Sequence, residues 1–373
     1  MSNPPLRGLR VLDFTQLLPG AVCTQYLADL GAEVIKIEPP GSGDAARGPA
    51  GAPPGGIFDL TNRNKKSVVL DLKQPEAVAA VRRLVAGADI LVEGFRPGVM
   101  ARFGLGYADL QPLRPALIYC AITGYGQDGP LAAKAGHDIN YQAEAGILGQ
   151  NVVDGSRPSP GGFPIADLAG GGLSAAAGIL AALFDAQRSG QGRYIDIAMT
   201  DCAMALNVAA LASRAMFGAP NPVPGRDILS GGLPCYRTYR TADDRYLAVG
   251  ALEPKFWRNF CAALGRPDLA ARGWDMGAKL AAAVAEVAAE IACKTLAEWM
   301  EIFTNVDACV SPVLSLAESL DSAHAAARGT VMAVGEGEAA TTHYANPIRM
   351  SGYAFEVTLP PPVLGAHNGD ILS

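Results

Sequence analysis

Histidine is scarce in this sequence: the chain has four histidines in 373 residues, and His137 is one of them. It stands in the glycine-flanked stretch AGHDINYQAEAG, directly before Asp138. An imidazole with an ordinary pKa of about 6.5 can give or take a proton at neutral pH, so His137 is a candidate acid–base group. The segment also fits a structural use, because these side chains can pin a turn by hydrogen bonds to the backbone.

Asp167 stands 30 residues after His137 and opens the stretch DLAGGG, which leads into a long apolar segment. An aspartate just before a helix is a preferred N-cap, so capping is one interpretation. A carboxylate whose pKa is raised by burial is also a general acid or base, which is the other. Whether the two groups can act together depends on the elements that carry them.

The first half of the chain alternates short apolar runs with segments of helical period. This is the pattern of βαβ units around a largely parallel sheet. The expected strands cover residues 9–14, 33–38, 66–72, 89–95 and 116–126. We therefore predict an α/β fold with a Rossmann-like large domain.

Two familiar kinds of cofactor site are missing from the sequence pattern. The turn after Phe14 reads TQLLPGAVC, with one glycine in place of the G-x-G-x-x-G of a dinucleotide site. The seven cysteines are scattered and form no C-x-x-C pair. We expect reduced thiols, no zinc or other metal site, and no nicotinamide or flavin.

The second half contains a smaller lobe. A Pro- and Gly-rich stretch at 218–232 looks like a linker, and a hairpin-like run and two helices follow it. We predict a large domain over 1–217, a small α+β domain over 218–315, and a C-terminal segment over 316–373.

Charge and hydropathy limit the partners. Thirty Lys and Arg against 36 Asp and Glu give a net charge of −6, which disfavours a broad nucleic-acid surface. The apolar run at 173–184 is too short and too rich in alanine to span a bilayer, so we expect no membrane insertion. A cytoplasmic location is expected. In a protein with this net negative charge, an anionic ligand would need a local cluster of Lys and Arg side chains at its binding site.

The motifs along nearly the whole chain resemble the class III CoA-transferase superfamily and, within it, the 2-methylacyl-CoA racemases. The resemblance is carried by GLRVLDFTQLLPG, LADLGAEVIKIEPP, NRNKKSVVLDLK, VEGFRPGV, TGYGQDGP, AGHDINY, DLAGGG, DDRYLAVGALEPKF and DACVSPVL. AGHDINY followed by DLAGGG and ALEPKFW is typical of the racemase-like subset.

The resemblance implies a two-base reaction without a cofactor, in which CoA is part of the substrate. His137 and Asp167 would exchange protons with opposite faces of the carbon next to the thioester carbonyl, and Glu253 would orient the histidine. Asp138 and Tyr141 would support them. For the oxygen of the intermediate enolate we nominate the N–H of Asp167 as donor.

The resemblance also implies where CoA lies. Lys36, Lys73 and Arg96 would contact it, Leu72 would lie beside the adenine, and Arg63 is a further candidate. These residues stand at or near expected strand ends, where open α/β sheets bind ligands.

The architecture of the family implies two interlocked subunits, with the C-terminal segment returning to the large domain. Glu253 of the partner subunit would then reach His137. Such a homodimer is implied by the resemblance, not by periodicity.

Two other functions stay open. In a CoA-transferase, Asp167 would attack an acyl-CoA and carry the acyl group, a reaction that gives His137 no role on the opposite face. A non-catalytic acyl-CoA-binding protein would keep the cations but has no need of His137, Asp167 and Glu253 together.

Overall fold

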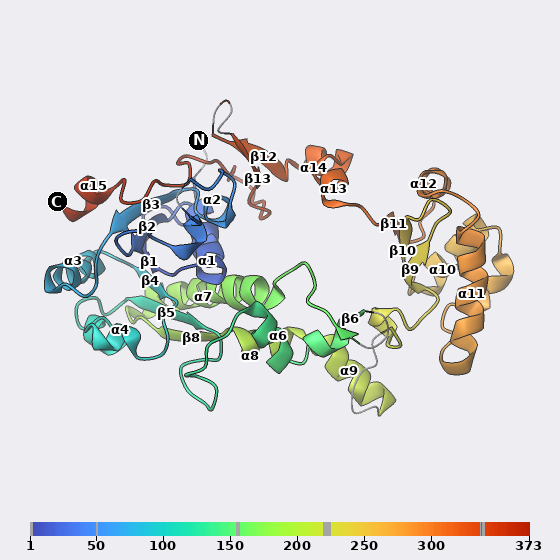
Figure 1. Cartoon of the computed structure of the whole chain (residues 1–373), viewed down its shortest axis with the longest axis horizontal. Coiled ribbons are helices and arrows are strands. Elements are labelled where there is room, and N and C mark those ends of the chain that lie inside the picture. The colour runs from blue at the N-terminus through green and yellow to red at the C-terminus, as the bar shows by residue number, and fades with distance from the viewer. Residues whose placement is uncertain (1–2, 50, 154–156, 219–224, 336, 338–339) are drawn as a thin grey trace. The chain divides into compact units, whose positions relative to one another are not determined.

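The computed structural model describes residues 3–49, 51–153, 157–218, 225–335, 337 and 340–373 (Figure 1). The chain divides into two compact units. The first comprises Met1–Leu148, Pro160–Leu206 and Ala323–Ser373, and the second comprises Gly149–Ser159 and Asn207–Ser322.

The first unit is built on a six-stranded sheet in the order β3-β2-β1-β4-β5-β8, and every pair of neighbouring strands is parallel. The strands are β1 Arg10–Phe14, β2 Glu33–Glu38, β3 Lys65–Val69, β4 Ile90–Glu93, β5 Ile118–Thr123 and β8 Tyr194–Ala198. The prediction of an α/β fold with a central parallel sheet is confirmed. The direction of winding reverses between β1 and β4, the point where open sheets of this kind bind ligands.

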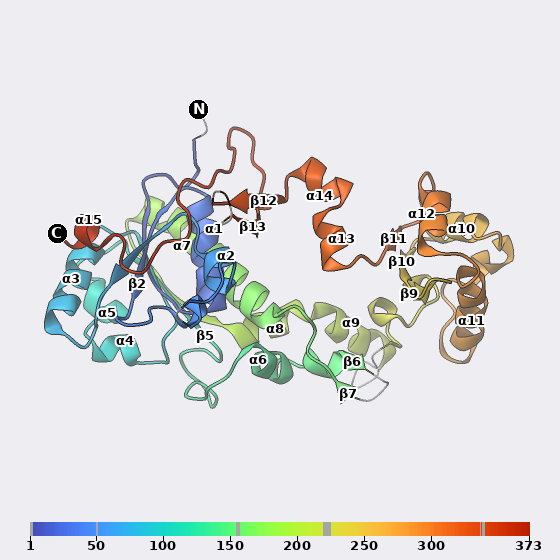
Figure 2. The same cartoon turned by 45° about the horizontal axis from the view of Figure 1, so that its top comes forward.

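Helices cover both faces of this sheet, as Figures 1 and 2 show. Alternate residues of each strand face opposite sides. Val11 and Ile90 pack with α1 and α7, whereas Leu12 and Leu91 pack with α3, α4 and α5. The helices of the first unit are α1 Leu18–Asp29, α2 Ile57–Thr61, α3 Pro75–Ala86, α4 Val99–Arg102, α5 Tyr107–Leu110, α6 Asp138–Glu144, α7 Ser174–Ser189, α8 Met199–Leu206, α14 Ala323–Arg328 and α15 Asn368–Leu372.

A π-helical segment, η3 (Ala166–Leu173), leads directly into α7. Together they form a 24-residue helical stretch, Ala166–Ser189, in which an 18-residue window has a mean hydropathy of 1.5. By length and composition alone, this stretch could cross a membrane. This stretch is longer than the run at 173–184 considered from the sequence. The core helix of a soluble protein passes the same test, and here Ala175, Ile179 and Leu183 are buried in the core beside the sheet.

The C-terminal segment lies along strand β3, which is one edge of the sheet. The N–H of Ser67 donates to His367 Nδ1 (3.1 Å), and the N–H of Val69 donates to Asn368 Oδ1 (2.8 Å). His367 in turn donates its N–H to the carbonyl of Ser67 (3.0 Å). A two-stranded sheet of β12 Val331–Val334 and β13 Thr341–Tyr344 precedes this contact.

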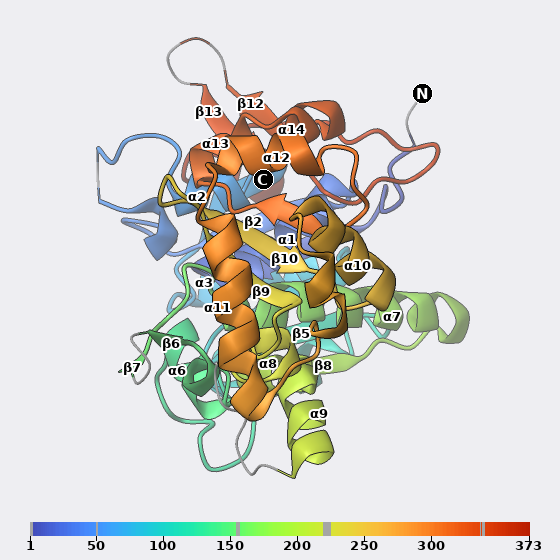
Figure 3. The same ribbon diagram turned by 90° about the vertical axis from the view of Figure 1, so that its right-hand side faces the viewer.

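The second unit has a three-stranded antiparallel sheet in the order β11-β10-β9, whose core includes residues of α10, α11 and α12 (Figure 3). Its strands are β6 Val152–Val153, β7 Arg157–Pro158, β9 Tyr236–Arg240, β10 Tyr246–Gly250 and β11 Val310–Pro312. Its helices are α9 Val208–Phe217, α10 Pro254–Ala263, α11 Leu280–Ile291, α12 Leu296–Phe303 and α13 Leu316–Leu320.

Residues 149–159 and 207–217, which we expected in the large domain, belong to the second unit, and so do residues 316–322, which we expected in the C-terminal segment. Helix α9 belongs to the second unit, because Ser213 donates to the carboxylate of Asp227 and Asn207 accepts from Gln150 (3.0 Å). The second unit ends after Ser322, and the following residues return to the first unit.

Candidate active site

A cavity of about 330 Å³ opens at the carboxyl ends of β1, β4 and β5. Three loops that follow these strands line it, together with the segment before α6 and the start of η3. The lining residues that could act on a ligand are Thr15, Gln16, Arg96, Tyr125, Lys134, His137, Tyr141 and Asp167. The cavity therefore lies at the sheet position where α/β folds bind ligands.

His137 is the N-cap residue of α6. Its backbone closes the cap, because the N–H donates to Asn140 Oδ1 (3.0 Å) and the carbonyl accepts from the N–H of Asn140 (2.8 Å). His137 is exposed and lines the cavity. His137 can therefore both cap the helix and act as an acid or base, because the cap uses its backbone atoms and leaves its imidazole unused.

Asp167 is the second residue of η3 and lies partly buried in the wall of the same cavity. It is not the N-cap, a position that Ile165 occupies. Burial, followed by the negative charge of Asp138, raises the pKa of Asp167 to about 6, although His137 opposes this. A carboxyl group with this pKa can both accept and return a proton near neutral pH.

Asp138 joins the two candidate groups. Its Oδ1 accepts the N–H groups of Ala166 (2.8 Å) and Asp167 (3.0 Å), and its Oδ2 accepts from Gln142 (2.5 Å). The residue next to His137 therefore holds the backbone of Asp167. The N–H of Asp167 is already bonded to Asp138, so its nomination as the oxyanion donor is not supported.

Tyr141 anchors the loop that precedes His137. Its hydroxyl donates to the carbonyl of Gly136 (2.5 Å), and its ring meets the ring of Tyr125 edge-on at 5.2 Å. A Cβ at Gly124 or Gly136 would lie 2.2 Å or 2.7 Å from the Tyr141 ring, so glycine is needed at both positions. Burial raises the pKa of Tyr141 to about 12, which keeps the hydroxyl protonated as a donor.

The predicted CoA contacts divide into two groups, and the first group lines cavities. Arg96 lines the cavity of His137 and Asp167, while Leu72 and Lys73 line a neighbouring cavity of about 170 Å³. Gln16 and Phe95 belong to both linings. One extended ligand could therefore reach from Lys73 to His137.

Lys36 and Arg63 form the second group, and both are buried. Lys36 Nζ pairs with Asp44 (2.8 Å), and Arg63 pairs with Asp29 (2.6 Å). Burial alone would lower the pKa of Lys36, but Asp13 and Asp44 outweigh it and raise the pKa. Because both cations are satisfied inside the protein, the structure gives neither of them the access to a phosphate that we expected.

Sequence reasoning did not select Lys134, which lines the cavity three residues before His137. Thr15 and Gln16, in the loop after β1, were likewise not selected. A lysine directly before AGH, beside a candidate site for an anionic ligand, is the signal that would have pointed to Lys134.

Glu253 belongs to the second unit, where it is the exposed N-cap residue of α10. Its interaction with His137 therefore stays a prediction.

In the part of the chain that the structure describes, no three His, Cys, Asp or Glu side chains gather where they could hold a metal ion. All seven cysteines are free thiols.

The model of CoA-transferase family III matches residues 6–368. The chain belongs to this family. It is 38% identical to the alpha-methylacyl-CoA racemase of Homo sapiens over 98% of this chain and 92% of that protein. It is 32% identical to the succinyl-CoA:glutarate CoA-transferase of Mus musculus over 100% of this chain and 86% of that protein. Racemases and transferases thus both occur among its relatives at similar identity.

Solved structures agree with this placement. The crystal structure of a mutant of Rv3272 from Mycobacterium tuberculosis superposes with a TM-score of 0.88 and 34% identity, covering 100% of both chains. The α/β fold with its central parallel sheet is therefore shared with this solved structure.

Proposed function

We propose that this enzyme racemises or epimerises 2-methylacyl-CoA thioesters by proton transfer at the α carbon. The observation that carries the proposal is that two acid–base groups, His137 and Asp167, line one cavity, and burial brings the pKa of Asp167 to about 6. A CoA-transferase that uses Asp167 as its nucleophile gives His137 no comparable role.

The reaction needs no cofactor beyond the CoA of the substrate. One base takes the α proton, and the electrons of the C–H bond move to the thioester oxygen to form an enolate. The other group then returns a proton to the opposite face, and the roles of His137 and Asp167 reverse with the direction of the reaction. Arg96 and Lys134, with Leu72 and Lys73 next to them, would hold the CoA portion.

Family resemblance supports an interlocked homodimer as the working form. In that assembly, Glu253 of the partner subunit would hydrogen-bond His137 and fix its tautomer. The two groups that would transfer the proton, His137 and Asp167, both belong to the first unit.

The test is incubation of the purified enzyme with one epimer of a 2-methylacyl-CoA in D₂O, with no acceptor acid. We expect deuterium at the α carbon while the epimer ratio drifts toward unity. Transfer of CoA to an added carboxylic acid without α exchange would instead make Asp167 a nucleophile and the enzyme a transferase.

Asp138→Asn is expected to move the acid limb of the pH–rate profile to lower pH. The negative charge of Asp138 helps to raise the pKa of Asp167, so its removal lowers that pKa from about 6. Asp167 then stays ionised, and can act as a base, at a lower pH than in the unmodified enzyme. Asparagine keeps an oxygen that can accept the N–H groups of Ala166 and Asp167.

The measurement for Asp138→Asn is kcat/KM for removal of the α proton between about pH 4 and 8, with the epimer whose proton Asp167 takes. An acid limb that stays in place or moves to higher pH contradicts the assignment of that limb to Asp167.

Arg96→Ala is expected to raise KM for the acyl-CoA by about 10-fold, the cost of one charge-assisted hydrogen bond, with a smaller change in kcat. Arg188→Ala is the control, because Arg188 is exposed at the end of α7 and lies against Phe184. An unchanged KM for Arg96→Ala removes this residue from the CoA site.

A further inference from the structure

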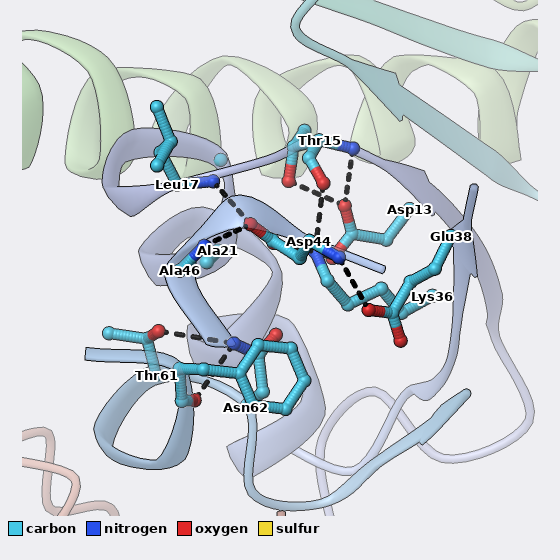
Figure 4. A network of polar contacts seen from close by, with 12 residues as sticks. Asp13, Thr15, Leu17, Ala21, Lys36, Glu38, Asp44, Ala46, Thr61 and Asn62 are labelled. Atoms are coloured by element: carbon cyan, nitrogen blue, oxygen red, sulfur yellow. Dashed lines mark hydrogen bonds and ion pairs between the residues drawn. The ribbon is translucent and has the colours of Figure 1, made fainter. Parts of the chain in front are cut away.

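A buried set of charges lies beneath the loop that follows β1 (Figure 4). Asp13 and Lys36 are cross-strand neighbours on β1 and β2, and both are buried. Asp13 Oδ1 accepts the N–H (2.9 Å) and the hydroxyl (2.6 Å) of Thr15. Lys36 Nζ donates to the carbonyl of Thr15 (2.8 Å). The first residue of the loop is thus held at three atoms.

Asp44 extends this set to the next part of the loop. One carboxylate oxygen pairs with Lys36 Nζ (2.8 Å), and the other accepts the N–H groups of Leu17 (3.0 Å) and Ala46 (2.9 Å). The N–H of Asp44 donates to Glu38 Oε2 (3.0 Å). Asp44 is therefore fixed from its backbone and from both of its oxygens, and it presents one of them to Leu17.

The backbone of Leu17 needs such support. Its φ is 62° and its ψ is −146°, a conformation that glycine adopts readily and a leucine rarely does. Leu17 directly precedes α1 and has no side-chain cap hydrogen bond. Its N–H bond to Asp44 is a contact that can hold this conformation in place.

The strained residue forms part of the candidate active site. Thr15, Gln16 and Leu17 line the same cavity as His137 and Asp167. A relaxed Leu17 would change the direction of the chain at this wall, and misplacement of a substrate by about 1 Å can cost about 100-fold in rate.

We propose that Asp44, held by Lys36, is a positioning residue that keeps Leu17 in its strained conformation and so shapes the substrate wall of the cavity. The proposal rests on the proposed function for its assay. It gives Lys36 a role in place of the phosphate contact that the structure does not allow. Buried ion pairs are weak contributors to stability, and conformational specificity is the role that such pairs serve in some proteins.

The test is a double-mutant cycle between positions 44 and 17. Leu17→Ala and Leu17→Gly both remove the leucine side chain, but only glycine adopts the native backbone conformation without strain. Asp44→Ala is expected to lower kcat/KM for α exchange by about 10- to 100-fold in the Leu17→Ala background. In the Leu17→Gly background the same change is expected to cost no more than about twofold.

An equal loss in both backgrounds would mean that Asp44 acts through general stability and not through Leu17. No loss in either background would also overturn the proposal. Thermal unfolding of each variant is measured alongside. If Asp44 has a purely structural role, Asp44→Ala lowers the melting temperature, but its effect on activity per folded molecule is the same in the Leu17→Ala and Leu17→Gly backgrounds.

Asp44→Ala removes the nearer carboxylate from the buried Lys36 and leaves only Asp13, at 4.0 Å, to pair with it, which could prevent folding. The second comparison therefore starts from Lys36→Met, which removes the buried cation. Lys36→Met with Asp44→Asn keeps an oxygen for the N–H of Leu17, whereas Lys36→Met with Asp44→Ala does not. We expect the asparagine variant to be about 10-fold more active. Equal activities would contradict the role of the Leu17 contact.

The two proposals can fail separately. If the unmodified enzyme catalyses CoA transfer and no α exchange, the racemase proposal falls, and the same cycle is measured on the transfer reaction. If α exchange occurs but the cycle shows no coupling, only the positioning role falls.

Discussion

Replacing His137 with alanine is expected to lower the rate of epimerisation by about 10²- to 10⁴-fold, the usual contribution of a general acid–base group. His137 lines the cavity with an exposed side chain, while its backbone makes the hydrogen bonds that begin α6. The substitution should therefore remove the proton acceptor and leave the helix and CoA binding nearly unchanged. The measurement is the rate of change of the epimer ratio, with the dissociation constant for CoA determined in parallel.

His324→Ala is the matched control, since His324 is an exposed histidine of α14 outside the cavity lining. Epimerisation by the His137→Ala enzyme at the rate of the unmodified protein would end the two-base assignment. Loss of CoA binding together with activity would instead show that His137 supports the site and does not act in the chemistry.

Asp167→Asn is expected to lower epimerisation by a similar factor, about 10²- to 10⁴-fold. The amide has nearly the shape of the carboxyl group and keeps the backbone N–H that donates to Asp138, but it cannot take up the α proton. His137 can still remove and return a proton on its own face. One epimer should therefore exchange its α proton for deuterium with retention of configuration.

The pair of variants separates the two activities found in the family. A transferase with an Asp167 nucleophile would lose CoA transfer in Asp167→Asn and keep much of it in His137→Ala. A racemase would lose epimerisation in both variants. Asp185→Asn on α7 is the control, because Asp185 pairs with Arg193 outside the cavity lining.

The sheet, and the placement of His137 and Asp167 in one cavity, could be predicted from the sequence, because their signals are local. Alternating apolar runs indicated the parallel strands, and family motifs placed His137 and Asp167 in one site. Lys36 was predicted to contact CoA, but the structure buries it. The register of β1 and β2 sets it beside Asp13, and its ammonium group pairs with Asp44 inside the protein.

The bond between Asp138 and the N–H of Asp167 was also beyond the sequence. This hydrogen bond depends on the packing of α6 against η3, which more than 20 residues of chain separate. Hydrophobic periodicity does not predict a contact between such elements. The π-helical turn of η3 has no distinct composition, since its three glycines suit many loops as well.

The contact between strand β3 and the C-terminal segment has a consequence for biosynthesis. The N–H groups of Ser67 and Val69 find their partners in His367 and Asn368, about 300 positions further along the chain. A nascent polypeptide, or one shortened by a protease before residue 367, therefore presents an open strand edge, which is a template for pairing with other chains. His367 and Asn368 therefore shield this edge of the first unit's sheet from pairing with other chains.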